Sequence, residues 1–214
     1  MDLKIRGLCP LTAKRRVIRI ITDSLLDTGV LRDVFPKKER RRKALEYYLY
    51  REAGYQMTHG RAYGLDGAGR EAIILLGSDD FSEKKRSLFN RVREKMGCRR
   101  AGLRLTSTER EKIHRMIEEI HQMERGINLP RKHIHLEFMG VRRTFQRCGR
   151  GGALLDRVIR ISEDRKIPIV CCNHNPEATG YFQKKGFKVV GITSSKRFRV
   201  MNIYMMRETD FLER

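Results

Sequence analysis

The segment FQRCGRGGALLDRVIR, residues 145–160, places three glycines directly before an amphipathic helical pattern. Glycine loses more conformational freedom on folding than any other residue and weakens a helix, so its presence here needs another explanation. A strand-like segment, HIHLEFMGV at residues 133–141, comes before the glycines, and a short apolar segment, residues 168–172, follows the helix. Strand, helix and strand at this spacing form a βαβ unit with parallel strands. The sequence therefore predicts an α/β fold around this unit.

The glycine loop also has the composition of an anion site. Glycines between a strand and a helix let backbone N–H groups approach an anion closely, and the helix N-terminus adds about half a positive charge. Arg147 and Arg150 add full charges. The loop fits neither the GxxxxGK[ST] pattern of a P-loop nor the GxGxxG pattern of a dinucleotide fold, since Leu154 stands at the third glycine position. A pyrophosphate site is the functional interpretation, and a tight strand-to-helix turn is the structural alternative.

The order of motifs around the loop is similar to that of the GNAT superfamily of N-acetyltransferases. QRCGRG at residues 146–151 matches the superfamily signature Q/R-x-x-G-x-G/A, and YFQKKGF at residues 181–187 resembles its Y-x-x-x-G-F end motif. A subgroup similar to puromycin N-acetyltransferase has the pattern HxYLxxLGV before the loop, in register with His133, Leu136, Gly140 and Val141. The resemblance implies an α/β GNAT fold, in which helices flank a mixed central sheet with splayed parallel strands and a helical insertion is added.

The 214 residues suffice for one domain with an insertion. We expect a single GNAT domain over residues 1–214, made of N-terminal helices at 1–58, a hairpin at 59–77, a helical insertion on the acceptor side at 78–130 and an acetyl-CoA-binding core at 131–214.

Local signals place several elements within these parts. Thr106 and Glu109 fit a capping box, which predicts a helix that ends near Gly126. The pattern further predicts a helix through residues 17–25, a helix from about Pro36 to Gly54, a hairpin turn around Asp66 and Gly67, a strand at 72–76, a basic helical stretch at 84–96, and closing strands at 187–192 and 198–208.

The resemblance implies that acetyl-CoA binds along the strand and the glycine loop. The backbone near Met139 and Val141 would hold the pantetheine arm, and the loop would wrap around the pyrophosphate. The cofactor-binding residues expected in this way are Met139, Gly140, Val141, Gln146, Arg147, Cys148, Gly149, Arg150, Gly151, Gly152, Asn175 and Phe182.

The chemical groups match the superfamily less closely than the cofactor loop does. Glu137 is the expected base, and a backbone N–H near Val141 would stabilise the oxyanion. The usual acid is a tyrosine four residues before the glycine of the end motif, but that position holds Phe182, with Tyr181 adjacent. Tyr181 is a candidate acid, although one helical step rotates it by about 100° from that position. Assistance by backbone dipoles or water and unassisted departure of the thiolate are the alternatives.

Alternate residues of a strand face the same side, so His133, His135 and Glu137 are expected together. They either line a wet cleft or, less in keeping with acetyl transfer, hold a metal.

The formal net charge of +21 favours a polyanionic partner, and its densest block is KKERRRK at residues 37–43. This block is either a solvated helix face or a docking patch. We expect a cytoplasmic enzyme that transfers acetyl groups from acetyl-CoA to a primary amine of a small molecule or peptide, with no metal and no membrane contact. A non-catalytic acyl-CoA-binding protein and a nucleic-acid-associated protein remain as alternatives.

Overall fold

A mixed seven-stranded sheet forms the centre of the protein. Its computed structural model describes residues 7–27, 29–58, 61–65, 71–77, 98, 102–198 and 200–209. The strands of these residues lie in the order β1-β2-β3-β4-β5-β7-β6, and among them only β4 and β5 run parallel. Their bounds are β1 Cys9–Pro10, β2 Ala62–Gly64, β3 Ala72–Gly77, β4 Ile134–Val141, β5 Ile169–Asn173, β6 Lys188–Ser195 and β7 Val200–Arg207. The predicted parallel unit is thus β4–α6–β5.

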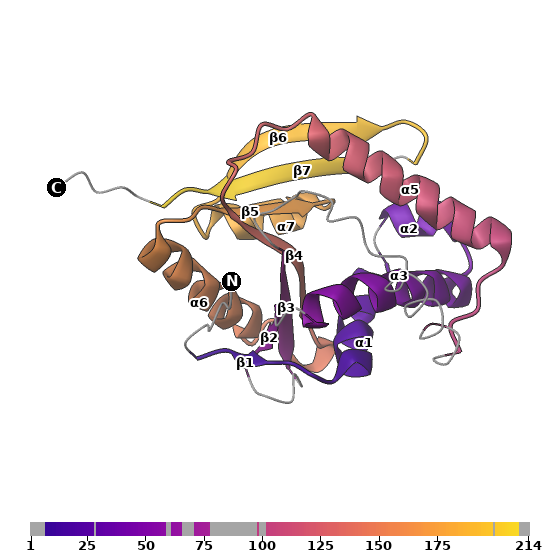
Figure 1. Cartoon of the computed structure of the whole chain (residues 1–214), viewed down its shortest axis with the longest axis horizontal. Helices are drawn as coiled ribbons and strands as arrows, with labels where there is room; N and C mark the ends of the chain where they lie inside the picture. Colours follow the sequence, from indigo (N-terminus) through magenta and orange to yellow (C-terminus); the bar gives the residue numbers. More distant parts are fainter. Residues whose placement is uncertain are drawn as a thin grey trace.

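Helices cover both faces of the sheet. Figure 1 shows α6 on one side of β3 and β4, and α1 and α3 on the other. The helix bounds are α1 Lys14–Leu25, α2 Gly29–Val34, α3 Lys38–Thr58, α5 Ser107–Arg125, α6 Arg150–Arg165 and α7 Pro176–Gln183, with a 3₁₀ turn, η1, at Arg143–Phe145. As a label of position only, we call the face covered by α1, α3 and α5 the acceptor side; contact of this face with an acceptor remains a prediction. No helix of the described ranges is both long enough and apolar enough to cross a membrane.

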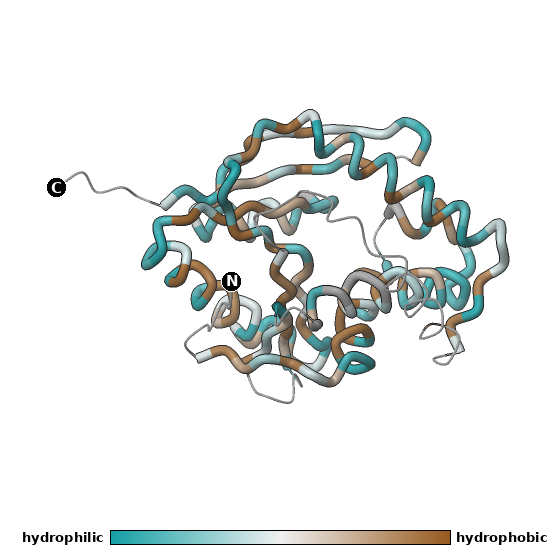
Figure 2. The backbone as a smooth tube through the Cα atoms, in the orientation of Figure 1, coloured by the Kyte–Doolittle hydropathy of each residue, from teal (hydrophilic) through white to brown (hydrophobic). Residues whose placement is uncertain are grey.

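The hydrophobic core is divided by the sheet into two main clusters. One contains Leu154, Leu155 and Val158 of α6, packed on β3 and β4. The other, on the acceptor side, joins α1 and α3 to the opposite face of β3. Figure 2 shows hydrophobic residues gathered on the central strands, whereas α5 is largely hydrophilic. The sheet therefore has an apolar layer on each face.

Strands β4 and β5 are paired only at their beginning. The parallel register joins Ile134 to Ile169, His135 to Val170 and Leu136 to Cys171, and then ends. Beyond that point β4 continues along β3 to Val141, while β5 continues along β7 to Asn173. The two strands diverge like the arms of a V, which is the splay expected from the sequence.

A β-bulge lies in β4 where the two strands separate. Leu75 pairs with Phe138 and Leu76 with Leu136, so Glu137 has no partner on β3. The extra residue shifts the alternation of side chains. Leu136 and Met139 both contact the α6 cluster, whereas Phe138 contacts the acceptor-side cluster. Bulges of this kind re-aim side chains and are frequent beside active sites.

Most of the predicted elements are present, with shifted ends. The capping box at Thr106 and Glu109 is formed, and Gly126 is the C-cap of α5. The second helix begins at Lys38 rather than near Pro36 and continues past Gly54 to Thr58. The hairpin strands and closing strands are confirmed as β2, β3, β6 and β7. The turn at Asp66 and Gly67 and the helical stretch at 84–96 lie outside the described residues, and the division of the chain into the four parts remains a prediction.

Helix α5 is attached at both ends. Near its start, Glu109 forms a 2.7 Å ion pair with Arg40 of α3. Near its end, Glu119 accepts a hydrogen bond from Ser195 of β6. Just after the helix, Ile127 lies against Gly191, so closely that a Cβ on this glycine would be 2.5 Å from its side chain. The helix therefore joins α3 to the strands of the opposite arm.

The basic block at residues 37–43 binds other parts of the protein. Arg42 forms a 2.8 Å ion pair with Asp23 of α1. Arg41 is only 5% exposed, and its guanidinium donates to the carbonyl oxygens of Phe35 and Pro36 at 3.1 and 3.2 Å. The expectation of a solvated face or docking patch is therefore wrong for Arg41.

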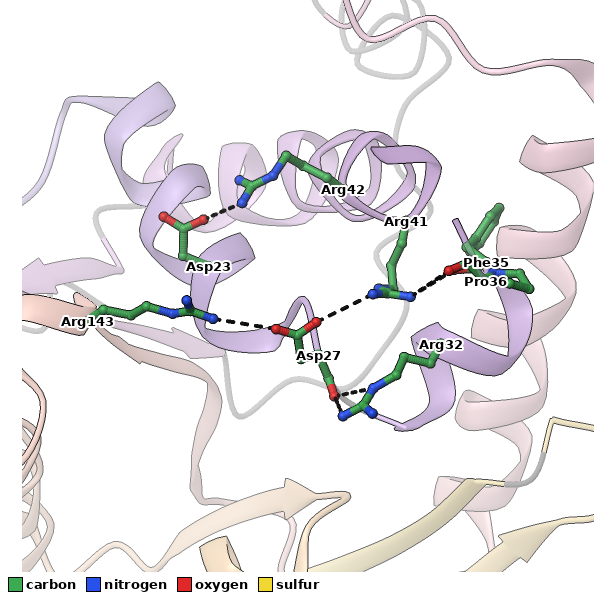
Figure 3. Close-up of polar contacts among 8 residues, drawn as sticks. All are labelled: Asp23, Asp27, Arg32, Phe35, Pro36, Arg41, Arg42 and Arg143. Atoms are coloured by element: carbon green, nitrogen blue, oxygen red, sulfur yellow. Dashed lines mark hydrogen bonds and ion pairs between the residues drawn. The ribbon is translucent and has the colours of Figure 1, made fainter. Parts of the chain in front are cut away.

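Asp27 connects this block to the segment after β4. Its carboxylate lies 3.4 Å from Arg41 and 3.5 Å from Arg143, while its backbone carbonyl accepts from Arg32 (Figure 3). The turn between α1 and α2 thus contacts both α3 and η1. Of these arginines only Arg41 is buried. Those that pair with Asp23 or Asp27 add to the number of basic residues, but each pair has no net charge.

We predict that replacing Arg41 by methionine lowers the free energy of unfolding by about 2 kcal/mol, because the buried carbonyl of Phe35 and the partly buried carbonyl of Pro36 lose a charged donor. The matched control is Lys43→Met on the same helix, where the side chain is exposed and the change should stay within about 0.5 kcal/mol. Urea denaturation measures both values. Equal effects of the two substitutions would mean that the Arg41 contacts contribute no stability.

Candidate active site

The loop between β4 and α6 is an exposed concave turn of backbone. Arg147 and Gly149 both have left-handed backbone, with φ of 61° and 73°, and Gly149 is the N-cap of α6. Such alternation turns successive N–H groups to one side, which suits an anion. Residues 146–149 form a turn, and the backbone bond from Ala153 to the carbonyl of Gly149 closes the first turn of α6. The predicted loop residues therefore lie together at the start of α6.

A left-handed conformation explains one of the three glycines. An added Cβ at Gly149 would meet no atom within 4 Å, so the backbone angle and not space demands glycine there. Gly151 has a different reason, since its Cβ would approach Val141 at 3.2 Å. Gly151 thus lets the start of α6 pack closely on the end of β4.

Among the described residues, no strand pairs with the end of β4 on the edge that faces away from β3, next to this loop. The backbone N–H of Arg142 donates to the backbone carbonyl of Glu71, so Arg142 and Glu71 are a hydrogen-bonded pair of the antiparallel ladder. Hydrogen-bonded and non-hydrogen-bonded pairs alternate, so Met139 and Val141 direct their N–H and C=O groups away from β3. On that side β5 has already diverged. The backbone positions expected to bind the pantetheine arm are therefore on the unpaired edge.

Side chains around the loop partly compensate its charges. Gln146 donates to the carbonyl of Val141 at 3.1 Å, which joins the loop to the open edge. Arg150 forms a 3.0 Å ion pair with Glu71. Lys185 pairs with Asp156 at 2.6 Å, and its Nζ is 3.8 Å from where a Cβ on Gly152 would stand. Lys185 is a cation beside the loop that the sequence analysis missed, because it comes from the segment after α7.

The two aromatic residues of the end motif differ in their surroundings. Phe182 is 6% exposed and stacks edge-on against Phe187 at 5.2 Å between ring centroids. Tyr181 is half-buried, and its hydroxyl lies 3.8 Å from where a Cβ on Gly151 would stand. This hydroxyl is buried without a hydrogen-bond partner among the described residues. Burial and the nearby Asp156 raise the pKa of Tyr181, so it stays protonated at neutral pH.

Asn175 acts as a helix cap. Its side chain accepts from the N–H of Glu177 at 3.0 Å at the start of α7, and its own N–H donates to Asn173 at 3.2 Å. A role in cofactor binding remains a prediction for this residue.

Glu137 and His135 form a hydrogen-bonded pair on the acceptor side. Their side chains meet at 3.2 Å between Oε1 and Nδ1, and Glu137 is 30% exposed whereas His135 is 8% exposed. The absence of a side chain at Gly77 makes room, since a Cβ there would lie 2.6 Å from the Glu137 Oε1. The pair thus brings a partly accessible carboxylate to the bulge of β4.

His133 does not join this pair. Its Nδ1 donates to the carbonyl of Pro130 at 2.7 Å, and its ring centroid is 6.1 Å from that of His135. Within the described part of the chain, no group of three or more His, Cys, Asp or Glu side chains has an arrangement that could hold a metal. The expected trio therefore separates into a structural histidine and a histidine–glutamate pair.

Other ionisable side chains surround the pair. Burial alone would lower the pKa of His135, but attraction by Glu137 and Glu124 outweighs burial and raises this pKa. Burial is likewise outweighed at Glu137, whose pKa is lowered by His135, His121 and Arg61. Burial and the charge of Glu137 raise the pKa of Glu124 on α5.

The neighbouring strand of the other arm contributes a thiol. Burial and Glu124 raise the pKa of Cys172 to about 12, so it stays neutral. Glu124 and the raised pKa of His135 were not predicted from the sequence, because neither follows from a local pattern.

Residues 108–207 match the family model described as the acetyltransferase (GNAT) domain. The match covers a little under half of the chain and extends from α5 to the end of β7. Proteins with this domain use acetyl-CoA. A comparison with curated proteins finds no match.

Solved acetyltransferase structures resemble almost the whole chain. An N-acetyltransferase from Staphylococcus aureus has a TM-score of 0.55 at 12% identity, over 93% of this chain and 98% of its own. A histone acetyltransferase and related acetyltransferase from Corynebacterium glutamicum has a TM-score of 0.61 at 12% identity, over 97% of this chain and 98% of its own. A further acetyltransferase has a TM-score of 0.54 at 17% identity, over 95% of this chain and 99% of its own. At such identities the likeness concerns the fold, which is the GNAT fold.

We predict that Gly77→Ala separates Glu137 from His135 without unfolding the protein. The new methyl group takes the place of the flexible carboxylate and lies 3.1 Å from the Cβ of His135, which has to shift slightly. Burial lowers the pKa of His135 and the nearby Glu137 raises it. With Glu137 farther away, the pKa of His135 should fall. An NMR titration of the imidazole measures this pKa. Gly180→Ala is the control, since a Cβ at Gly180 meets no atom within 4 Å. An unchanged His135 titration in Gly77→Ala would contradict the geometry of the pair.

Proposed function

We propose that this protein is an N-acetyltransferase that moves the acetyl group of acetyl-CoA to a primary amine of a small molecule or peptide. The observation that carries the proposal is the open edge of β4, which lies directly beside the glycine loop. An extended pantetheine arm needs a strand edge with free backbone groups, and its pyrophosphate needs free N–H donors. Both stand side by side here.

In this proposal the chain binds the cofactor mainly through its backbone. The N–H groups of Arg147 to Gly152 hold the pyrophosphate, with support from the first turn of α6. The backbone of Met139, Gly140 and Val141 holds the pantetheine arm, and Gln146 connects the two regions. Asn175 contributes from the start of α7, and Phe182 contributes indirectly, through its contact with the ring of Tyr181. Backbone recognition explains why the match to the superfamily depends on glycines.

Glu137 serves as the base of the acetyl transfer. It takes one proton from the ammonium group of the acceptor, and the neutral amine then attacks the thioester carbonyl carbon. The C–N bond forms, and a backbone N–H near Val141 stabilises the negative oxygen. The C–S bond then breaks, the thiolate takes a proton, and the nitrogen releases its second proton to solvent.

Tyr181 gives the proton to the leaving thiolate in this proposal and regains one from solvent. Its hydroxyl is buried, lacks a partner among the described residues, and lies beside the first turn of α6. Its raised pKa keeps that proton in place until the thiolate forms. Phe182 lacks a hydroxyl and is packed in the core, so it only supports the ring of Tyr181.

The decisive experiment measures CoA release from acetyl-CoA with a panel of primary amines. Amine-dependent release supports the proposal. Tight binding of acetyl-CoA without release for any amine would favour the non-catalytic acyl-CoA-binding alternative. Binding to RNA or DNA with a steep salt dependence, in the absence of turnover, would favour the nucleic-acid alternative.

We predict that Gly149→Val abolishes acetyl-CoA binding measured by calorimetry. Valine resists a φ of 73° and would set a branched side chain among the N–H donors. Gly102→Val is a matched control, because Gly102 also has a φ of 73° and no atom within 4 Å of its Cβ position. It should cost similar stability and leave the affinity unchanged. Equal affinities of both variants for acetyl-CoA would show that the pyrophosphate does not bind at this loop.

We predict that Tyr181→Phe lowers kcat about 100-fold, the usual range for a positioned acid, while the Kd for acetyl-CoA changes only a few-fold. Steady-state CoA release and calorimetry give the two values. Tyr47→Phe, in the separate cluster around Phe35, is the control and should retain full activity. An unchanged kcat in Tyr181→Phe would instead support unassisted thiolate departure.

A further inference from the structure

The hydrogen bond between His135 and Glu137 has a defined direction. An ionised carboxylate only accepts hydrogen bonds, so Nδ1 of His135 must be the donor to Oε1 of Glu137 at 3.2 Å. His135 is almost fully buried and adjoins the parallel part of β4 and β5, where the sheet is paired on both sides. Glu137, by contrast, lies on the bulge and is partly accessible. The buried imidazole of His135 therefore holds the carboxylate of Glu137, which lies next to solvent.

The bulge makes such a support necessary. Glu137 has no partner residue on β3, and β5 has already left β4 at this position. A glutamate side chain has several rotatable bonds, and free rotation would carry the carboxylate away from an incoming amine. The contact with His135 and the space above Gly77 select one orientation on the acceptor side.

Charges from several elements face the pair. Glu124 and His121 approach it from α5, and Arg61 approaches Glu137 from the segment before β2. Cys172 of β5 and Tyr204 of β7 adjoin Glu124 and are neutral, since burial raises the pKa of both. His135 therefore lies between the carboxylates of Glu137 and Glu124, which together favour its protonated form.

We propose that His135 is a positioning residue that holds Glu137 in the orientation and the ionised state needed to accept a proton from the acceptor amine. The inference rests on the proposed function. His135 touches neither the acceptor nor the thioester in this scheme, and it acts through Glu137 alone. The acceptor's proton goes to Glu137, and His135 keeps its Nδ1 proton.

Two substitutions of His135 separate its effect on the orientation of Glu137 from its effect on the pKa of Glu137. His135→Leu removes both effects, and the displaced carboxylate of Glu137 should lower kcat/KM for the amine about 100-fold. His135→Asn retains a neutral donor close to the Nδ1 position and should restore most of the rate at high pH. In both variants Glu137 loses a positive neighbour, so its pKa rises and the low-pH limb of the kcat/KM profile moves to higher pH. The Kd for acetyl-CoA should stay unchanged.

The matched control is His114→Asn on α5. His114 also pairs with a glutamate, Glu118, at 3.4 Å, but both side chains are more than 60% exposed. This variant should leave the rate and the profile unchanged. A loss of rate in His135→Leu without movement of the low-pH limb, or an equal loss in His135→Asn, would overturn the proposal and leave His135 a structural residue.

An NMR titration of the protein without substrates gives a readout that does not depend on catalysis. Glu137→Gln should lower the pKa of His135, and Glu124→Gln should lower it by a smaller amount. An unchanged His135 titration in Glu137→Gln overturns the proposal even if acetyl transfer is found. The expected shift together with no turnover for any amine would instead reject the proposed function and keep the pairing of the two residues.

Discussion

The early end of the parallel pairing between β4 and β5 is the constraint on which the candidate site depends. Three residue pairs hold the strands together, and beyond Leu136 each strand follows its antiparallel neighbour. Unpaired backbone groups inside a protein are costly, so an open strand edge persists only where water or a ligand satisfies it. The glycine loop, the bulge with Glu137 and the first turn of α6 all adjoin this opening. Acetyl-CoA chemistry is the use of the opening that we propose.

The positive charge of the chain has a different basis from the anion site. Arg40, Arg41 and Arg42 connect α3 to α1, to the segment before α3 and to α5 through Asp23, Asp27, Glu109 and two backbone carbonyls. At the loop itself, recognition depends on backbone N–H groups, while Arg150 is engaged by Glu71. A count of basic residues therefore overstates how much of the surface is available to an anionic partner.

The sequence analysis succeeded where a short segment determines its own structure. The glycine loop, the parallel unit around α6 and the capping box at Thr106 all follow from local patterns, and the structure contains each of them. It failed where residues distant in the chain meet. The bulge at Glu137 depends on register against β3, the burial of Arg41 depends on Asp27, and Glu124 reaches His135 only because α5 crosses the acceptor side. The roles of Tyr181 and Phe182 depend in the same way on core packing, which a motif with a one-residue offset does not specify.

Helix α5 connects the two parts of the sheet that diverge between β4 and β5. One end is tied to α3, which packs with β3, and the other is tied to β6 through Ser195 and Gly191. A helix of 19 residues is a stiff rod about 28 Å long, at 1.5 Å per residue. Its length therefore fixes how far the arms can spread. The separation of the arms thus follows from the rise of a helix that is attached to both, so a shortened or lengthened α5 would change the width between them.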